Sequence, residues 1–155
     1  MLDKTQKYVL LGSCFSQYMG ERMESEGYHA LCNPVGTLFN PESIRNTVCH
    51  ALCGGAESLP MFHDRAMQEW RCWWANTRFR ADSEDEARAL VQEPFRALGD
   101  ALCHAGRLFL TLGTNVCYRL VEKGMAVSNC QRQADRLFRE DSLSLQQTCE
   151  VLEET

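Results

Sequence analysis

The stretch YVLLGSCFS, residues 8–16, decides how the fold of this chain is interpreted. Its apolar first half, Tyr8-Val9-Leu10-Leu11, is typical of a short buried strand, and the small residues Gly12 and Ser13 predict a tight turn after it. A helical pattern follows over residues 15–26. A strand, a small-residue turn and a helix hold a side chain at the carboxyl edge of a sheet, where α/β proteins place their chemistry. Ser13 is therefore the candidate nucleophile.

The composition is that of one globular domain. A chain of 155 residues, with 45% apolar and 24% charged residues, can bury one core and is short for two independent domains. The formal charge of -5 comes from interspersed acidic and basic residues, which offer no concentrated cationic face to nucleic acid. No apolar run has the length of a membrane span, and the N-terminus lacks a signal-peptide core. We therefore expect a cytoplasmic protein that binds neither nucleic acid nor membrane.

Nine cysteines are an odd number, and they are scattered through helical and strand-like patterns, which favours reduced thiols over a disulfide framework. Cys49 and Cys53 lie four residues apart on a predicted helix, with His50 between them, so both thiols share one face. A zinc site would need further ligands at short spacing, and the sequence has no second pair of this kind. We interpret the two thiols as core packing and expect no metal and no cofactor.

Four segments combine an apolar stripe at helical spacing with a start or stop signal. The segments are residues 15–26, 41–53, 83–105 and 144–155. The start signals are the cap Asn40 with Pro41 and the capping boxes Ser83/Glu86 and Ser144/Gln147. The stop signals are Gly27, Gly54-Gly55 and Gly106. Pro94 predicts a kink in the third helix. The last helix runs to the end of the sequence.

Further strands are predicted at residues 28–32 and 108–112. A hairpin around Gly124 is predicted from residues 116–121 and 125–128. Residues 58–81 are rich in aromatic side chains without a clean period and are interpreted as an extended insertion. Strands that alternate with helices predict a three-layer α/β fold with a mainly parallel sheet. Residues at neighbouring strand tips converge in such a fold, including the Gly113-Thr114-Asn115 turn after residues 108–112.

Four ordered blocks of this sequence resemble the bacterial GSCFA family. The blocks are Gly12-Ser13-Cys14-Phe15-Ser16, NPVGTLFNPESI at residues 33–44, Leu112-Gly113-Thr114 and Asn129-Cys130. Trp73 and Arg78-Phe79 also stand in the places of the family's Trp-containing segment. The similarity covers nearly the whole chain, with Ser16 in the position where the family name has alanine.

The GSCFA family is related to the SGNH (GDSL-like) hydrolases, which are flavodoxin-like three-layer α/β/α proteins with an acylated serine after the first strand. The resemblance implies one such domain over residues 1–155, acting as an esterase or acyltransferase on an acyl ester of a carbohydrate or cell-envelope glycan. It also implies an oxyanion hole made by the Ser13 N–H, Gly36 and Asn115. We expect Asn129 and Trp73 to contact the substrate.

The sequence departs from the family at the positions of histidines. The paired histidines of the Trp segment align with Ala75 and Asn76, and the histidine of the Asn-Cys-His block is Gln131. The general base of the wider superfamily is an Asp-x-x-His near the domain end, and no histidine follows His104 here. The resemblance therefore implies an N-terminal portion of the domain, whose uncovered apolar surface predicts dimerisation or aggregation.

Structural roles compete with the functional ones at each of these positions. Ser13 is also a normal helix-capping residue, and Cys14 at the same helix start is a rival nucleophile without a cationic neighbour. Asn129 would equally close the hairpin, and Trp73 would equally cover a core edge. Surface or core roles are favoured for all four histidines: His29, His50, His63 and His104. Without a base, the second hypothesis is a non-catalytic carbohydrate-binding or interaction module.

Overall fold

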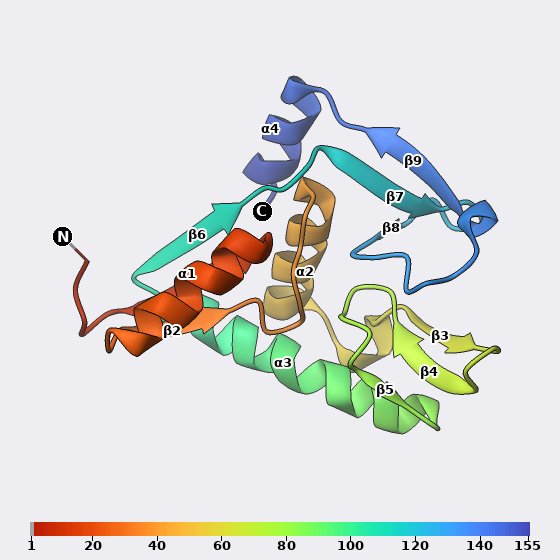
Figure 1. The fold of residues 1–155 in the computed structure, drawn as a ribbon, viewed down its shortest axis with the longest axis horizontal. Helices are drawn as coiled ribbons and strands as arrows, with labels where there is room; N and C mark the ends of the chain where they lie inside the picture. The colour runs from red at the N-terminus through yellow and green to blue at the C-terminus, as the bar shows by residue number, and fades with distance from the viewer. Residues whose placement is uncertain (1) are drawn as a thin grey trace.

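The computed structural model describes residues 2–155, and this part of the chain contains four α-helices and three small sheets (Figure 1). One sheet is parallel, with β1 (Lys7–Gly12) between β2 (His29–Cys32) and β6 (Arg107–Thr111). The chain thus forms a mixed α/β fold. The carboxyl ends of the three parallel strands meet at one edge of the sheet.

Helices cover both faces of the parallel sheet (Figure 1). Tyr8 and Leu10 pack against α1 (Cys14–Ser25), whereas Val9 and Leu11 face the core shared with α2 (Pro41–Cys53) and α3 (Glu84–His104). Because both faces of β1 are buried, its sequence is apolar throughout instead of alternating. None of the described helices combines the length and the apolar character that crossing a membrane requires.

The other two sheets are antiparallel, so the prediction of a mainly parallel sheet is wrong. One contains β3 (Met61–Asp64), β4 (Glu69–Cys72) and β5 (Arg80–Ala81); the other contains β8 (Ala126–Val127), β7 (Val116–Leu120) and β9 (Phe138–Ser142). Short turns join β3 to β4 and β7 to β8, and only antiparallel strands can be joined that way. The layered arrangement is confined to the parallel sheet.

The segment over residues 58–81 contains the antiparallel sheet of β3, β4 and β5, a regular structure that the sequence did not predict. A short 3-10 helix, η1 (Ala56–Ser58), leads into it. Strand β4 is at least partly buried along its whole length, so its sequence lacks the apolar-polar alternation by which a strand is recognised. Strand β9 also lacks a sequence signal because its residues are mostly charged. It follows a second 3-10 helix, η2 (Asp135–Leu137), and pairs with β7 along its whole length.

The predicted helix starts are confirmed. The side chains of Asn40 and Ser83 accept hydrogen bonds from the third residue of α2 and α3, and Ser144 with Gln147 forms a complete capping box on α4 (Leu145–Glu153). Helix α3 continues through Pro94 to His104. These starts depend on residues three positions apart, which explains why a sequence reveals them.

All nine cysteines are free thiols, but Cys49 and Cys53 are exposed, so the interpretation of this pair as core packing is wrong. Their helix α2 buries the opposite face, where Ile44 and Val48 enter the core. His50 lies on the buried side and is 7% exposed, with ring centroids 4.7 Å from Phe95 and 5.7 Å from Trp74. Burial in these apolar surroundings lowers the pKa of His50.

This burial predicts an acid-dependent loss of stability that originates at His50. In the unfolded chain the imidazole pKa is about 6.5, so below this pH the unfolded state binds more protons than the folded state. The free energy of unfolding should therefore decrease as the pH falls from about 7.5 to about 5, and less so in His50→Gln. Urea unfolding at both pH values measures this slope, with exposed His104→Gln as the control. Equal slopes in wild type and His50→Gln would contradict the assignment.

Candidate functional site

Ser13 stands where β1 ends and α1 begins. Its backbone is extended, with φ -66° and ψ 179°, and it caps α1 by accepting a hydrogen bond from the Phe15 N–H at 3.3 Å. The residue is 8% exposed. Its own N–H donates to the Thr111 carbonyl oxygen at 2.9 Å, which ties the turn to the tip of β6. The predicted strand, turn and helix thus hold Ser13 at the carboxyl edge of the parallel sheet.

Thr111 joins two serine hydroxyls at this edge. Its Oγ1 lies 3.1 Å from Ser13 Oγ and 2.8 Å from Ser16 Oγ. Ser16 is fully buried and also donates to the Leu11 carbonyl oxygen at 3.2 Å. The sequence analysis did not identify Thr111. The available signal was that Thr111 is the one polar residue in the apolar run of residues 108–112. Ser16 was not identified either, although the residue belongs to the quoted turn.

Gly12 allows this close approach of the two strand tips. Its φ of +138° is a conformation that side chains other than glycine rarely adopt, and a Cβ there would overlap the Thr111 carbonyl group. The Gly12 N–H donates to Asn33 Oδ1 at 2.9 Å, and its carbonyl oxygen accepts from Leu38 N–H at 2.8 Å. Both backbone groups of Gly12 are therefore held by the segment that follows β2.

The turn of residues 33–36 lies against Ser13 through Asn33, which is buried at 3% exposure with φ +41°. Asn33 Nδ2 donates to the Ser13 carbonyl oxygen at 3.4 Å, and the Asn33 carbonyl oxygen accepts from Gly36 N–H at 2.9 Å. Gly36 has φ +113°, and a Cβ there would lie 2.6 Å from the Cβ of Asn76. In this structure the Gly36 N–H is therefore used in the hydrogen bond that closes the turn of residues 33–36.

The loop after β6 approaches Ser13 through Gly113. A Cβ at Gly113 would lie 3.4 Å from Ser13 Cβ and 2.9 Å from Phe39 Cδ1, and its N–H donates to the Phe39 carbonyl oxygen. The Asn115 side chain instead donates to the Leu143 carbonyl oxygen at 2.7 Å. Its backbone carbonyl accepts the Leu143 N–H at 3.0 Å. Asn115 thus fastens the chain just before α4.

The positions at which the resemblance led us to expect histidines, Ala75, Asn76 and Gln131, converge beside the Gly36 turn. Gln131 Nε2 donates to the carbonyl oxygens of Ala75 and Cys72 at 2.6 and 2.9 Å. Asn129 Nδ2 also donates to the Ala75 carbonyl oxygen, at 3.2 Å, and Asn129 Oδ1 accepts the Gln131 N–H at 2.8 Å. Asn76 N–H donates to the Val35 carbonyl oxygen at 2.8 Å. Residues far apart in sequence therefore meet at one place.

Trp73 lies inside the protein between the two antiparallel sheets. Its ring stacks on Phe62, with centroids 3.7 Å apart, and meets the Phe138 ring edge to face at 5.6 Å. It is 6% exposed and shares a core cluster with Leu120 and Val127. The tryptophan therefore contributes packing energy, and Phe62 covers the ring face that a sugar would need.

Among the described residues, no histidine is hydrogen-bonded to Ser13. His29 pairs with Lys7 at the opposite, amino end of β1, and His63 pairs with Trp70 in the antiparallel sheet. His104 Nδ1 lies 2.7 Å from the Asp100 carbonyl oxygen at the end of α3. Residues 2–155 also contain no cluster of three or more His, Cys, Asp or Glu side chains arranged as metal ligands would be.

This arrangement surrounds the Ser13 hydroxyl with hydrogen-bonding groups, and none of its partners among the described residues is a histidine or a carboxylate. Ser13 Oγ lies at the N-terminus of α1, where N–H groups without intrahelical partners and the helix dipole favour a partial negative charge. The nearest described side-chain partner of Ser13 Oγ is the Thr111 hydroxyl, which is a weak base at neutral pH. Among the described residues, Ser13 therefore has no adjacent general base.

Removing the Thr111 hydroxyl should destabilise the site. Thr111→Val keeps the shape but leaves Ser13 Oγ and buried Ser16 Oγ without this partner, at a cost of about 1–3 kcal/mol. Thr111→Ser keeps the hydroxyl and should cost roughly half as much or less. The free energy of unfolding in urea measures both changes. A Thr111→Val variant as stable as the wild type would show that the hydroxyl cluster contributes nothing.

Comparison with known proteins agrees with the ordered blocks around this site. No curated protein and no solved structure matches the chain. One family model does match, and it spans the site turn, the Trp73 segment and the loop that carries Asn129. Because the GSCFA family model matches residues 7–155, which is nearly the whole chain, the protein belongs to the GSCFA family.

Proposed function

We propose that the protein is a serine esterase or acyltransferase in which Ser13 Oγ attacks the carbonyl carbon of an acyl ester. The observation that carries the proposal is the position of Ser13 at the carboxyl end of β1 and at the N-cap of α1. Nucleophiles of α/β enzymes commonly occupy such a position. An acyl ester of a carbohydrate or cell-envelope glycan is the substrate that the family resemblance implies.

The chemistry would proceed through an acyl-serine. The Ser13 oxygen bonds to the carbonyl carbon, the ester alcohol leaves with a proton, and water or a second alcohol then takes the acyl group. The Ser13 proton needs a general base, whose help contributes about 10²–10⁴-fold in rate. The resemblance assigns this task to the histidine of an Asp-x-x-His pair, and no described histidine is hydrogen-bonded to Ser13. Residues 1–155 alone should therefore acylate slowly and turn over poorly.

The proposed oxyanion donors are the N–H groups of Ser13 and Gly36 and the Asn115 amide. In this structure they bond to the carbonyl oxygens of Thr111, Asn33 and Leu143, so a substrate oxygen would have to replace those partners. The unpaired N–H groups in the first turn of α1 are further donors beside Ser13. We assign substrate contact to half-exposed Asn129 in preference to Trp73, whose ring Phe62 covers.

Covalent labelling tests the nucleophile directly. A serine-directed fluorophosphonate should label residues 1–155 at Ser13, and Ser13→Ala should abolish the label, as intact-mass and peptide spectrometry would show. Ser25→Ala, at the exposed end of the same helix, is the matched control and should label normally. Undiminished labelling of the Ser13→Ala variant would refute the assignment.

A specific observation favours a second function, a non-catalytic carbohydrate-binding module. Ser13 has no histidine partner among the described residues, and its N–H group and that of Gly36 are already bonded within the protein. Such a module should bind acetylated xylo-oligosaccharides or peptidoglycan fragments in calorimetry and show no fluorophosphonate label. Stoichiometric labelling at Ser13 would exclude it, and absence of glycan binding would count equally against it.

A further inference from the structure

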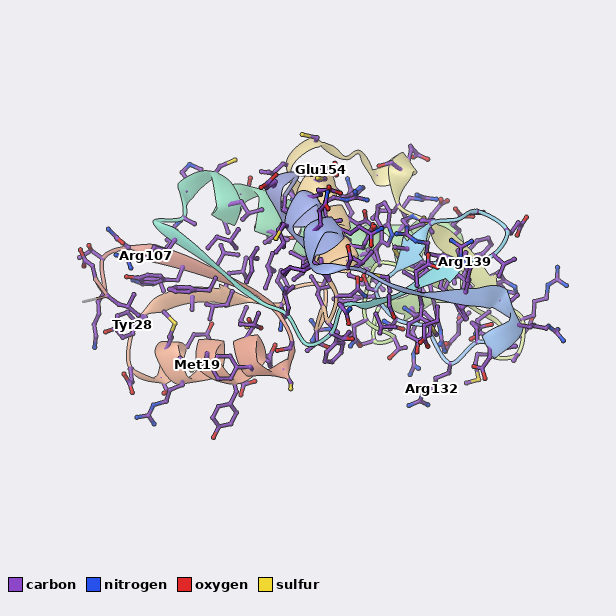
Figure 2. All side chains as sticks on the ribbon, turned by 90° about the horizontal axis from the view of Figure 1, so that it is seen from above. Met19, Tyr28, Arg107, Arg132, Arg139 and Glu154 are labelled. Atoms are coloured by element: carbon purple, nitrogen blue, oxygen red, sulfur yellow. The ribbon has the colours of Figure 1, made fainter. Side chains whose placement is uncertain are left out.

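A polar cavity of about 390 Å³ lies among the β3–β4 hairpin, residues 77–80 at the start of β5 and the loop of residues 131–134. Ser13 is not among its lining residues. Its polar lining includes Asp64, Arg71, Thr77, Arg80, Gln131 and Arg132. The volume is within the range of small-molecule sites in proteins. Figure 2 shows Arg132 at the surface of the part that holds the antiparallel sheets.

Arg71 lies under this cavity and is 4% exposed. Its guanidinium contacts Glu69 at 2.9 Å and Asp64 at 3.5 Å, and Nη1 lies 3.5 Å from the Gln131 carbonyl oxygen. Its Nε–H has no hydrogen-bond partner although the atom is shielded from solvent. A buried donor without an acceptor costs about 1–3 kcal/mol, more when it belongs to a charged group.

Gln131 carries the complementary unsatisfied group. The residue is 2% exposed, and Nε2 donates to two carbonyl oxygens, those of Cys72 and Ala75. Its Oε1 is buried and has no partner. Gln131 and Arg132 also adopt φ of +54° and +59°, a left-handed backbone that costs non-glycine residues about 1 kcal/mol each. Strained backbone and unsatisfied polar groups thus coincide at this loop, as they do at many binding sites.

The charges around the cavity do not balance. Arg71, Arg80 and Arg132 contribute three positive charges, and the carboxylates that contact this group are Asp64 and Glu69. One positive charge is left over. Asp64 is already saturated, because its oxygens accept from the N–H groups of Ala66 and Met67 and from Gln133 Nε2. A ligand with one negative charge would complete the group.

We propose that this cavity binds a small carboxylate that also carries hydroxyl groups. The carboxylate oxygen accepts from Arg71 Nε–H and neutralises the excess charge that Arg80 and Arg132 bring, and a hydroxyl donates to Gln131 Oε1. In this structure, Arg71 Nε and Gln131 Oε1 are both shielded from solvent. Binding therefore includes a rotation of the Arg71 and Gln131 side chains toward the cavity. The site goes beyond the proposed acyl chemistry and does not depend on Ser13.

Calorimetry and thermal unfolding with D-glucuronate as the probe test this site. Glucuronate should bind and raise the melting temperature, whereas glucose lacks the charge, acetate lacks the hydroxyls, and each should bind at least roughly ten-fold more weakly. The double variant Arg80→Gln, Arg132→Gln removes two exposed cations while Arg71 keeps both of its carboxylate partners, and should weaken glucuronate binding by about ten-fold or more.

Two control variants make the result decisive. Arg136→Gln removes an exposed arginine that does not line the cavity and should leave glucuronate binding unchanged. Ser13→Ala should also bind glucuronate like the wild type, which separates this site from the acyl-ester proposal. Absence of glucuronate binding, equal binding of glucose, or full binding by the double variant would each overturn the proposal.

Discussion

The contact between the tips of β1 and β6 is the constraint on which the rest of the structure depends. Gly12 has no side chain and adopts a positive φ, so the Thr111 carbonyl can occupy the space where a Cβ would stand. The Thr111 hydroxyl then holds Ser13 and Ser16, which fixes the first turn of α1 against the sheet. A side chain at Gly12 would separate the strand tips and displace Ser13 with them.

The block of residues 33–44 connects this contact to the antiparallel sheets. Asn33 holds both Gly12 and Ser13, and farther along Glu42 accepts hydrogen bonds from Arg119 at 2.6 Å and Arg45 at 2.9 Å. Glu42 is 6% exposed, so its charge needs these partners, and Arg119 lies on β7. Residues of the 33–44 block therefore hold the Ser13 turn through Asn33 and hold strand β7 through Glu42.

One turn lies between the Ser13 turn and the polar cavity that Arg71, Arg80 and Arg132 line. Asn76 bonds to Val35 beside Gly36 on one side, whereas the adjacent Thr77 lines the cavity on the other. Gln131 lines the same cavity and donates to the carbonyl oxygen of Ala75, just before this turn. Ala75, Asn76 and Gln131 thus link this turn to the cavity.

The sequence by itself determined the elements whose signals are local. The strand around residues 8–11, the helix caps, the hairpin after residue 115 and the turn that presents Ser13 depend on neighbours within a few positions, and the structure contains each of them. Only the tertiary structure decided the antiparallel sheets, the charged strand β9, the exposure of Cys49 and Cys53, and the partners of Trp73 and Asn115. The physical reason is that these depend on contacts between residues far apart in the chain, such as Thr111 with Ser13 and Gln131 with Ala75, which no local pattern encodes.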